Sequence, residues 1–186
     1  EPTSPQVAKM SIARKWLSTQ SPTVTLSSSD TYMLTTTDIG KMIYLETTYT
    51  INSLDHQTTT TTPAGPVVAP ITITGDKIRG STLSINEAQN SQWLTSVTIT
   101  STDYKWFIQD DITGTNQVQI TNPNPNQTYV IPNTTDIGSY IYVTVDYNVE
   151  SIGTISTNST LVGPLVAPVT ITGDKIRGST LSINEA

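Results

Sequence analysis

Two stretches of this chain are nearly identical, and their spacing constrains what the chain can fold into. Residues 67–88 read VVAPITITGDKIRGSTLSINEA and residues 165–186 read LVAPVTITGDKIRGSTLSINEA, so twenty of twenty-two positions recur 98 residues apart. A fixed period of this kind indicates an array of similar structural units. A unit of 98 residues is long enough to bury one small core, so we expect each unit to fold by itself.

A weaker match shows where the chain begins within this period. Residues 7–16 (VAKMSIARKW) align with residues 97–106 (VTITSTDYKW), and both end in Lys-Trp. The sequence therefore predicts three parts: a unit at 1–66 that lacks its first hairpin, a complete unit at 67–164, and the first hairpin of a following unit at 165–186. The aligned residues of the two units are 90 positions apart at this match and 98 apart further along the chain. The second unit therefore contains an insertion, which we place around residues 114–127 and expect to lie outside the sheets.

Alternating polar and apolar residues predict strands in most of each unit. Residues 71–74 and 82–86 alternate on either side of a Gly-Asp-Lys turn, which is typical of a β-hairpin. Along residues 141–146 the Ile and Val side chains share one parity and should face a core, whereas Asp146 lies on the parity that faces water. About seven short strands in a unit of this size are typical of a β-sandwich, so the predicted class is all-β.

Aromatic residues mark further strands. Trp16 and Trp106 are expected as core anchors, because an indole is the largest apolar group that the fold has to bury. Residues 7–13 contain helix-forming Ala, Lys and Met, but their match to the β-like residues 97–100 favours a strand. We also expect strands at Tyr32 and Tyr129, each of which precedes an Asp-Ile-Gly corner.

Composition excludes several classes of partner. Nine Lys and Arg against fifteen Asp and Glu give a net charge of −6 with no basic stripe, so nucleic acid is not an expected partner. No apolar run approaches the roughly 20 residues of a bilayer span, and membrane insertion is not expected. The chain has no cysteine, which rules out disulfides and thiolate metal sites.

One full set of residues resembles a known family of modules. Thr74, Gly75, Gly80, Thr82 and Leu83 form a Thr-Gly-x4-Gly-x-Thr-Leu pattern, followed by Tyr-x-Trp at 104–106 and by Asp-Ile-Gly-x-x-Ile-x-Val-x-Val at 136–145. This set resembles the bacterial and phage Ig-like repeats of adhesins, surface-layer proteins and virion structural proteins. The resemblance implies tandem Ig-like β-sandwiches in an extracellular, cell-surface or virion-surface protein.

No catalytic site is expected. His56 is the only histidine, and the aligned position in the other unit is Thr154, so a general base is not a repeated feature of the array. No nucleophile elbow, phosphate-binding glycine loop or histidine cluster occurs in the sequence. We therefore predict no enzyme activity and no cofactor apart from calcium as a weak candidate.

The weak calcium candidates are carboxylates and an amide in the second unit. Asp103, Asp110, Asp111 and Asn116 carry the oxygen ligands that calcium prefers. The alternative, which we favour, is that they are solvated turn residues, because no Asp-x-Asp-x-Asp spacing is present. The insertion also supplies candidate ligand-binding loop residues, since loops vary while a scaffold is kept: Asn116, Asn122, Asn124 and Asn126.

Three asparagines fit the Asn-x-Ser/Thr acceptor for N-glycosylation: Asn126, Asn133 and Asn158. Such triplets also arise by chance in a chain rich in Thr and Asn. The Thr run at residues 58–62 is a candidate for O-linked sugar. The alternative is that it is an edge strand kept polar, which resists pairing with other sheets.

The leading functional hypothesis is a non-catalytic stalk, filament or decoration spacer built from tandem repeats. The X-Pro steps at residues 67–70 and 165–168 support it, because they make stiff linkers. The alternative is an adhesion module that binds a glycan or receptor through its loops. Expected partners are adjacent repeats or copies of the chain head-to-tail: residues 165–186 of one chain could complete unit 1–66 of the next, although a cut from a longer polypeptide explains the same phase.

Overall fold

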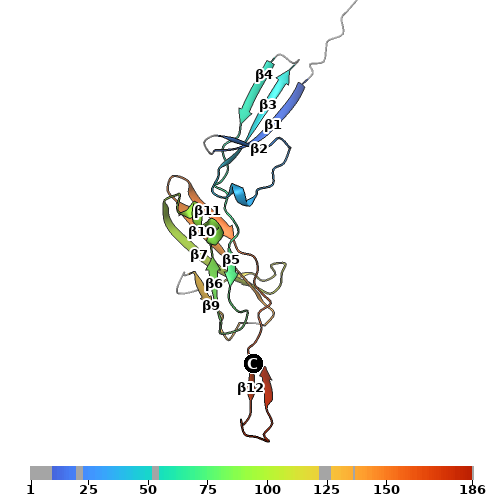
Figure 1. Cartoon of the computed structure of the whole chain (residues 1–186), viewed down its shortest axis with the longest axis vertical. Helices are drawn as coiled ribbons and strands as arrows, with labels where there is room; N and C mark the ends of the chain where they lie inside the picture. The colour runs from blue at the N-terminus through green and yellow to red at the C-terminus, as the bar shows by residue number, and fades with distance from the viewer. Residues whose placement is uncertain (1–9, 20–22, 52–54, 122–126, 136, 186) are drawn as a thin grey trace, which may run out of the picture. The chain divides into compact units, whose positions relative to one another are not determined.

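The structure is a computed structural model of the 186-residue chain, and it describes residues 10–19, 23–51, 55–121, 127–135 and 137–185. Strands take 49% of the chain and helices 6%, which confirms the all-β class. The chain divides into two compact units, Glu1–Ala69 and Pro70–Ala186 (Figure 1). We call them unit 1 and unit 2 and describe each by itself.

Unit 1 is built on one antiparallel sheet with the strand order β2-β1-β3-β4. Its strands are β1 (Met10–Ser18), β2 (Val24–Ser27), β3 (Ile43–Ile51) and β4 (Asp55–Thr60), and a short 3-10 helix, η1 (Thr36–Asp38), precedes β3. The strand predicted to end at Trp16 is confirmed over its described part. The Thr-rich run lies on β4 at the edge of the sheet, as its polar composition predicts.

Residues 70–166 of unit 2 contain two antiparallel sheets, with strand orders β11-β10-β7-β8 and β5-β6-β9. The strands are β5 (Thr72–Thr74), β6 (Thr82–Asn86), β7 (Ile99–Gln109), β8 (Val118–Gln119), β9 (Thr128–Val130), β10 (Tyr140–Val149) and β11 (Gly153–Asn158). The four-stranded sheet repeats the strand order of unit 1, with β7 in the place of β1 and β10 in the place of β3. The prediction that the insertion lies outside the sheets is wrong at β8, which pairs with β7.

The two sheets of unit 2 pack face to face in a sandwich-like arrangement. The rings of Trp106 on β7 and Tyr129 on β9 stack with their centroids 5.5 Å apart. Ile141, Val143 and Val145 on β10 are fully buried, which confirms the predicted inward parity. Asp146 has the outward parity, yet it too is largely covered, because neighbouring side chains on β7 and β11 contact its carboxylate.

A helical crossover in unit 2 was not expected from the sequence. After β6 the chain forms η2 (Ala88–Asn90) and α1 (Ser91–Leu94) before it enters β7. Trp93 on α1 is buried with its ring edge against Tyr147, at a centroid distance of 5.4 Å. The Tyr147 hydroxyl donates to the Glu87 carboxylate at 2.6 Å, and burial, reinforced by this carboxylate, raises the pKa of Tyr147. The Asn86 side chain, which accepts from the Ala88 amide, is the local signal that marks the turn.

The last segment forms a hairpin of its own, β12 (Val169–Thr172) paired with β13 (Ser182–Glu185). Its register is that of β5 and β6: Ile171 pairs with Ile183 as Ile73 pairs with Ile85. Gly173 has a φ of 125° where its counterpart Gly75 has 123°, and a Cβ at either position would clash with a carbonyl oxygen of the facing strand. The hairpin geometry is therefore a local property of the repeated sequence.

The strand expected at Tyr32 does not form. Residues 31–35 of unit 1 have no strand structure, whereas the aligned Tyr129 lies on β9. In unit 2, β9 is held by main-chain pairing with β6. The described residues of unit 1 contain no counterpart of β6, so the edge at Tyr32 has the sequence of a strand but no partner strand.

No helix among the described residues is long and apolar enough to cross a membrane.

Candidate functional site

The same backbone arrangement follows β4 in unit 1 and β11 in unit 2, and we call it the exit segment: residues 64–68 in unit 1 and residues 162–166 in unit 2. Each exit segment contains a cis Gly-Pro bond. An isolated antiparallel bridge joins its first residue to Ile43 in unit 1 and to Ile141 in unit 2. Further matched bonds are Gly40 N–H to Val67 O (2.7 Å) and Val67 N–H to Lys41 O (2.9 Å) in unit 1, and Gly138 N–H to Leu165 O (2.9 Å) and Leu165 N–H to Ser139 O (2.9 Å) in unit 2. The two units therefore close in the same way although their sequences differ.

An apolar hollow of about 480 Å³ lies beside the exit segment of unit 1, and we call it the unit 1 groove. Trp16, Tyr32, Leu34 and Ile43 line it together with residues 64–68. Six of the aligned residues of unit 2 are in the core: Trp106, Tyr129, Ile131, Ile141, Val162 and Leu165. The unit 1 groove is therefore an unfilled half of a core of the kind that unit 2 completes. Trp16, predicted as a core anchor, is only half-buried because it forms a wall of this groove.

The aromatic wall of the groove is held in place by a buried carboxylate. Trp16 and Tyr32 stack with centroids 6.4 Å apart, and the Trp16 indole N–H donates to the Ser29 carbonyl at 3.1 Å. The Tyr32 hydroxyl donates to Asp38 Oδ2 at 2.7 Å. The amide and hydroxyl of Thr35 donate to the same oxygen, each at 2.9 Å. These bonds fix the position of the Tyr32 ring in the wall of the groove.

Asp38 is fully buried, and its surroundings favour the ionised form. Burial acts to raise the pKa of Asp38, but the hydrogen bonds from Tyr32 and Thr35 outweigh it, with Lys41 adding attraction at 3.8 Å. The pKa of Asp38 consequently lies below its ordinary value. A carboxyl whose folded pKa is depressed contributes stability above its unfolded pKa and loses that contribution as pH falls through the folded pKa.

Unit 1 should therefore lose stability on acidification, beginning near pH 4 and continuing below it, around the lowered pKa of Asp38. Asp38→Asn should destabilise unit 1 at neutral pH by about 1–3 kcal/mol, because a charged hydrogen-bond acceptor is lost in a buried place. It should also flatten the acid dependence. Urea unfolding followed by the amide signals of β3 at several pH values measures both effects, and an unchanged acid slope in Asp38→Asn would contradict the assignment.

The weak calcium candidates separate into two places. Asp110, Asp111 and Asn116 lie in one turn between β7 and β8, whereas Asp103 lies on β7, where it pairs with Asp146. Within the turn, Asn116 Nδ2 donates to Asp110 Oδ2 at 2.7 Å. The Asp111 carboxylate accepts from the hydroxyl and amide of Thr113 and from the Thr115 amide.

The carboxylate oxygens of Asp110 and Asp111 thus accept hydrogen bonds from residues of the same turn, and these bonds stabilise the conformation of the turn. Hydrogen bonds from Thr113 and then Thr115 hold the pKa of Asp111 well below its ordinary value. Among the described residues, no group of three or more His, Asp or Glu side chains is placed to hold a metal ion. Calcium binding at this turn stays a prediction.

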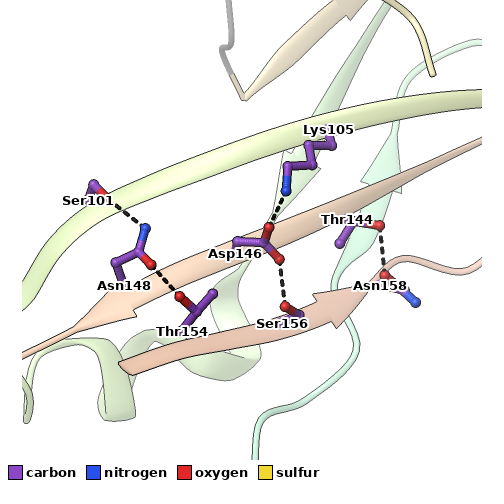
Figure 2. Close-up of polar contacts among 8 residues, drawn as sticks. All are labelled: Ser101, Lys105, Thr144, Asp146, Asn148, Thr154, Ser156 and Asn158. Carbon is purple, nitrogen blue, oxygen red and sulfur yellow. Dashed lines mark hydrogen bonds and ion pairs between the residues drawn. The ribbon is translucent and has the colours of Figure 1, made fainter. Parts of the chain in front are cut away.

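Polar side chains form rungs across the outer face of the four-stranded sheet of unit 2 (Figure 2). In the central rung, Lys105 Nζ and Ser156 Oγ both donate to the Asp146 carboxylate, at 2.5 and 2.6 Å. The hydrogen bond from Lys105, followed by that from Ser156, lowers the pKa of Asp146. Figure 2 shows two further rungs, Ser101–Asn148–Thr154 and Thr144–Asn158.

The outer face of unit 1 carries the same kind of rung. His56 Nδ1 lies 3.0 Å from Thr50 Oγ1, and these residues align with Thr154 and Asn148. His56 is exposed on the edge strand β4. The aligned residue of unit 2, Thr154, makes the corresponding cross-strand hydrogen bond to Asn148 with its hydroxyl group. This placement gives His56 the role of a cross-strand hydrogen-bond partner.

The remaining sequence candidates lie at several places. Asn122, Asn124 and Asn126 lie outside the described residues. Asn133 is exposed in the loop after β9, and Asn158 is exposed at the end of β11, where its amide oxygen accepts from Thr144 at 2.8 Å. The unit 1 groove was not identified from the sequence, although the phase of the repeat indicated that this unit lacks a hairpin.

In comparisons with known proteins, the chain matches no family model and no curated protein.

Proposed function

We propose that the chain is part of a tandem array of Ig-like units that serves as a non-catalytic spacer, a stalk, filament or decoration of a cell surface or virion. The matched exit segments carry this proposal. Units 1 and 2 differ in most of their sequence, yet both close through the same pair of main-chain bonds, at 2.7–2.9 Å. A protein whose neighbouring units must always be joined in the same way needs the same backbone geometry at every junction. The sequence of the rest of each unit can then vary.

The stretch between the exit segment of unit 2 and β12 also supports a stiff connection between repeats. Leu165 is buried, and the next residue, Val166, donates its amide to the Lys77 carbonyl at 2.9 Å. The Val166 carbonyl in turn accepts from the Arg79 amide at 3.1 Å. Only Ala167 and Pro168 separate these bonds from β12, and proline restricts both its own backbone and that of the residue before it. Neighbouring units are therefore expected to keep a preferred angle.

Small-angle scattering of recombinant arrays with two, three and four copies of residues 67–164 tests the proposal. The maximum dimension should increase by the same amount with each added copy, as in a rod. A matched array with Pro70→Gly at every junction, the position that aligns with Pro168, should be shorter on average, because glycine softens the linker. A maximum dimension that stops growing after two copies would show collapse of the units onto each other and would refute the spacer role.

A further inference from the structure

Two segments of unit 2 that are far apart in sequence lie side by side and run in the same direction. Ile71, just before β5, forms an isolated parallel bridge with Ser159, just after β11, and Ile78 forms a second one with Val166. The two bridges are seven residues apart in both segments, so the register is the same at both ends. We call the stretches from Ile71 to Ile78 and from Ser159 to Val166 the parallel segments.

Hydrogen bonds hold the far end of the parallel segments in place. The Val166 amide donates to the Lys77 carbonyl at 2.9 Å, and the Arg79 amide donates to the Val166 carbonyl at 3.1 Å. Lys77 Nζ donates to the Gly163 carbonyl at 3.4 Å, and Arg79 Nε donates to the Thr135 carbonyl at 2.5 Å. Main-chain and side-chain bonds therefore act on the same few residues at this end of the contact.

Both segments are also fixed to the core of the unit. Ile71 and Leu165 are 1% exposed, and Val162 is 7% exposed. The Ser159 amide donates to the Val143 carbonyl at 2.9 Å, and the Val143 amide donates to Ser159 Oγ at 3.0 Å. Sliding one segment along the other would therefore displace buried side chains as well as break the bonds between the segments.

The direction of the two segments decides how tension along the chain loads this contact. Tension enters at Pro70, before the first segment, and leaves at Ala167, after the second. Because the segments run in the same direction, these two points lie at opposite ends of the contact. Tension therefore slides the segments past each other, and the bonds between them carry the load together.

The exit segment of unit 2 also belongs to an antiparallel pair, which is loaded differently. The Leu165 amide donates to the Ser139 carbonyl at 2.9 Å, and Ile141 forms an antiparallel bridge with Val162. Tension that enters just before Ser139 and leaves just after Leu165 acts on one end of this pair. The bonds then break one after another, and each carries the whole load in turn.

We propose that the parallel segments make residues 70–167 a load-bearing element that resists tension applied along the chain. Resistance to forced unfolding depends on the rate of unfolding and not on the equilibrium free energy. That rate is slowed by interactions that are present in the folded state and broken in the transition state. In this direction of pulling, these are the bonds between the parallel segments.

The inference rests on the proposed spacer role, because a unit within a stalk or filament is one that experiences tension along its chain. It adds a property that spacing alone does not require. The scattering test measures the length of unloaded arrays, whereas a pulling experiment measures the resistance of one unit. Either can therefore fail while the other succeeds.

Pulling the 186-residue chain along two directions tests the proposal. The chain has no cysteine, so two introduced cysteines define where the DNA handles of an optical trap are attached. Pro70→Cys with Ala167→Cys loads the parallel segments, and Ile137→Cys with Ala167→Cys loads the antiparallel pair. Pro70 and Ile137 are exposed and Ala167 is partly exposed, so both chains should have the same free energy of unfolding in urea.

At one pulling rate, the first pair of handles should require a higher mean force to unfold unit 2 than the second pair. The folded protein and its equilibrium stability are the same in both cases, so a difference in force reports the direction of loading. Equal mean forces in the two directions, or a higher force for the second pair, would overturn the proposal.

A proline substitution tests which bonds carry the load. Val166→Pro removes the amide that donates to the Lys77 carbonyl, and Val166 is 44% exposed, so little packing is lost. At constant force through Pro70→Cys and Ala167→Cys, this variant should unfold about fivefold faster, as expected for the loss of one hydrogen bond from the folded state.

Glu150→Pro is the matched control, because it also removes one main-chain donor, the amide that bonds to the Thr98 carbonyl at 3.0 Å. Glu150 precedes Ser151, which has a φ of 64°, in a turn closed by the bond from the Ile152 amide to the Val149 carbonyl. Proline is common at this position of such a turn. Under the same force Glu150→Pro should unfold at the unsubstituted rate, and equal acceleration by both proline variants would contradict a load carried by the parallel segments.

Discussion

Leu83→Ala is expected to destabilise unit 2 by about 2–5 kcal/mol, whereas Leu181→Ala should change its stability by less than about 0.5 kcal/mol. The two leucines have identical sequence neighbours over the preceding and following residues of the hairpin. They differ in burial: Leu83 is 0% exposed and Leu181 is 54% exposed. Removing a buried side chain costs its transfer free energy and leaves a cavity, but removing an exposed one does neither.

Urea unfolding of unit 2, followed by the amide signals of β10, measures the difference. Equal losses of stability at the two positions would mean that the second hairpin is packed as tightly as the first within the single chain. That result would contradict the exposure of β12–β13.

Trp106→Ala should be the most damaging single substitution in unit 2, at about 3–5 kcal/mol. Trp106 is fully buried and stacks on Tyr129 across the two sheets, so its loss removes contacts on both sides of the core. The matched control is Trp16→Ala in unit 1. Trp16 is half-buried at the wall of an open groove, where solvent can occupy the vacated space, and its loss should cost about 1 kcal/mol.

Circular dichroism and amide spectra during urea unfolding report both changes without relying on tryptophan fluorescence. Equal losses of stability at Trp106 and Trp16 would contradict the difference in burial between the two side chains.

Much of the architecture was predictable because strand patterns are local. Alternation along β10 identified Ile141, Val143 and Val145 as core residues, and the structure confirms all three. The repeat resolved the helix-or-strand ambiguity before Trp16 in favour of β1. The crossover at residues 88–94 was not predicted, because its strongest signal, a buried Trp93, depends on contact with Tyr147 on a distant strand.

The candidate site was less predictable, because it consists of contacts that are missing in one unit and present in the other. Asp110, Asp111 and Asn116 were correctly grouped by proximity in sequence, but their bonding to the turn's own donors is a matter of geometry. Tyr32 has the sequence of a strand and lacks only a partner. Pairing is a long-range event, and no local pattern reports whether the partner strand is present.

The sequence by itself determined the period, the all-β class and the shape of each hairpin, since alternation, turn glycines and register act over a few residues. Only the tertiary structure decided which of two nearly identical hairpins is a core element and which presents its apolar face to solvent. The physical reason is that burial depends on what lies opposite a side chain. Leu83 pairs with Tyr129 across the sheet and is 0% exposed, whereas Leu181, with the same local sequence, is 54% exposed.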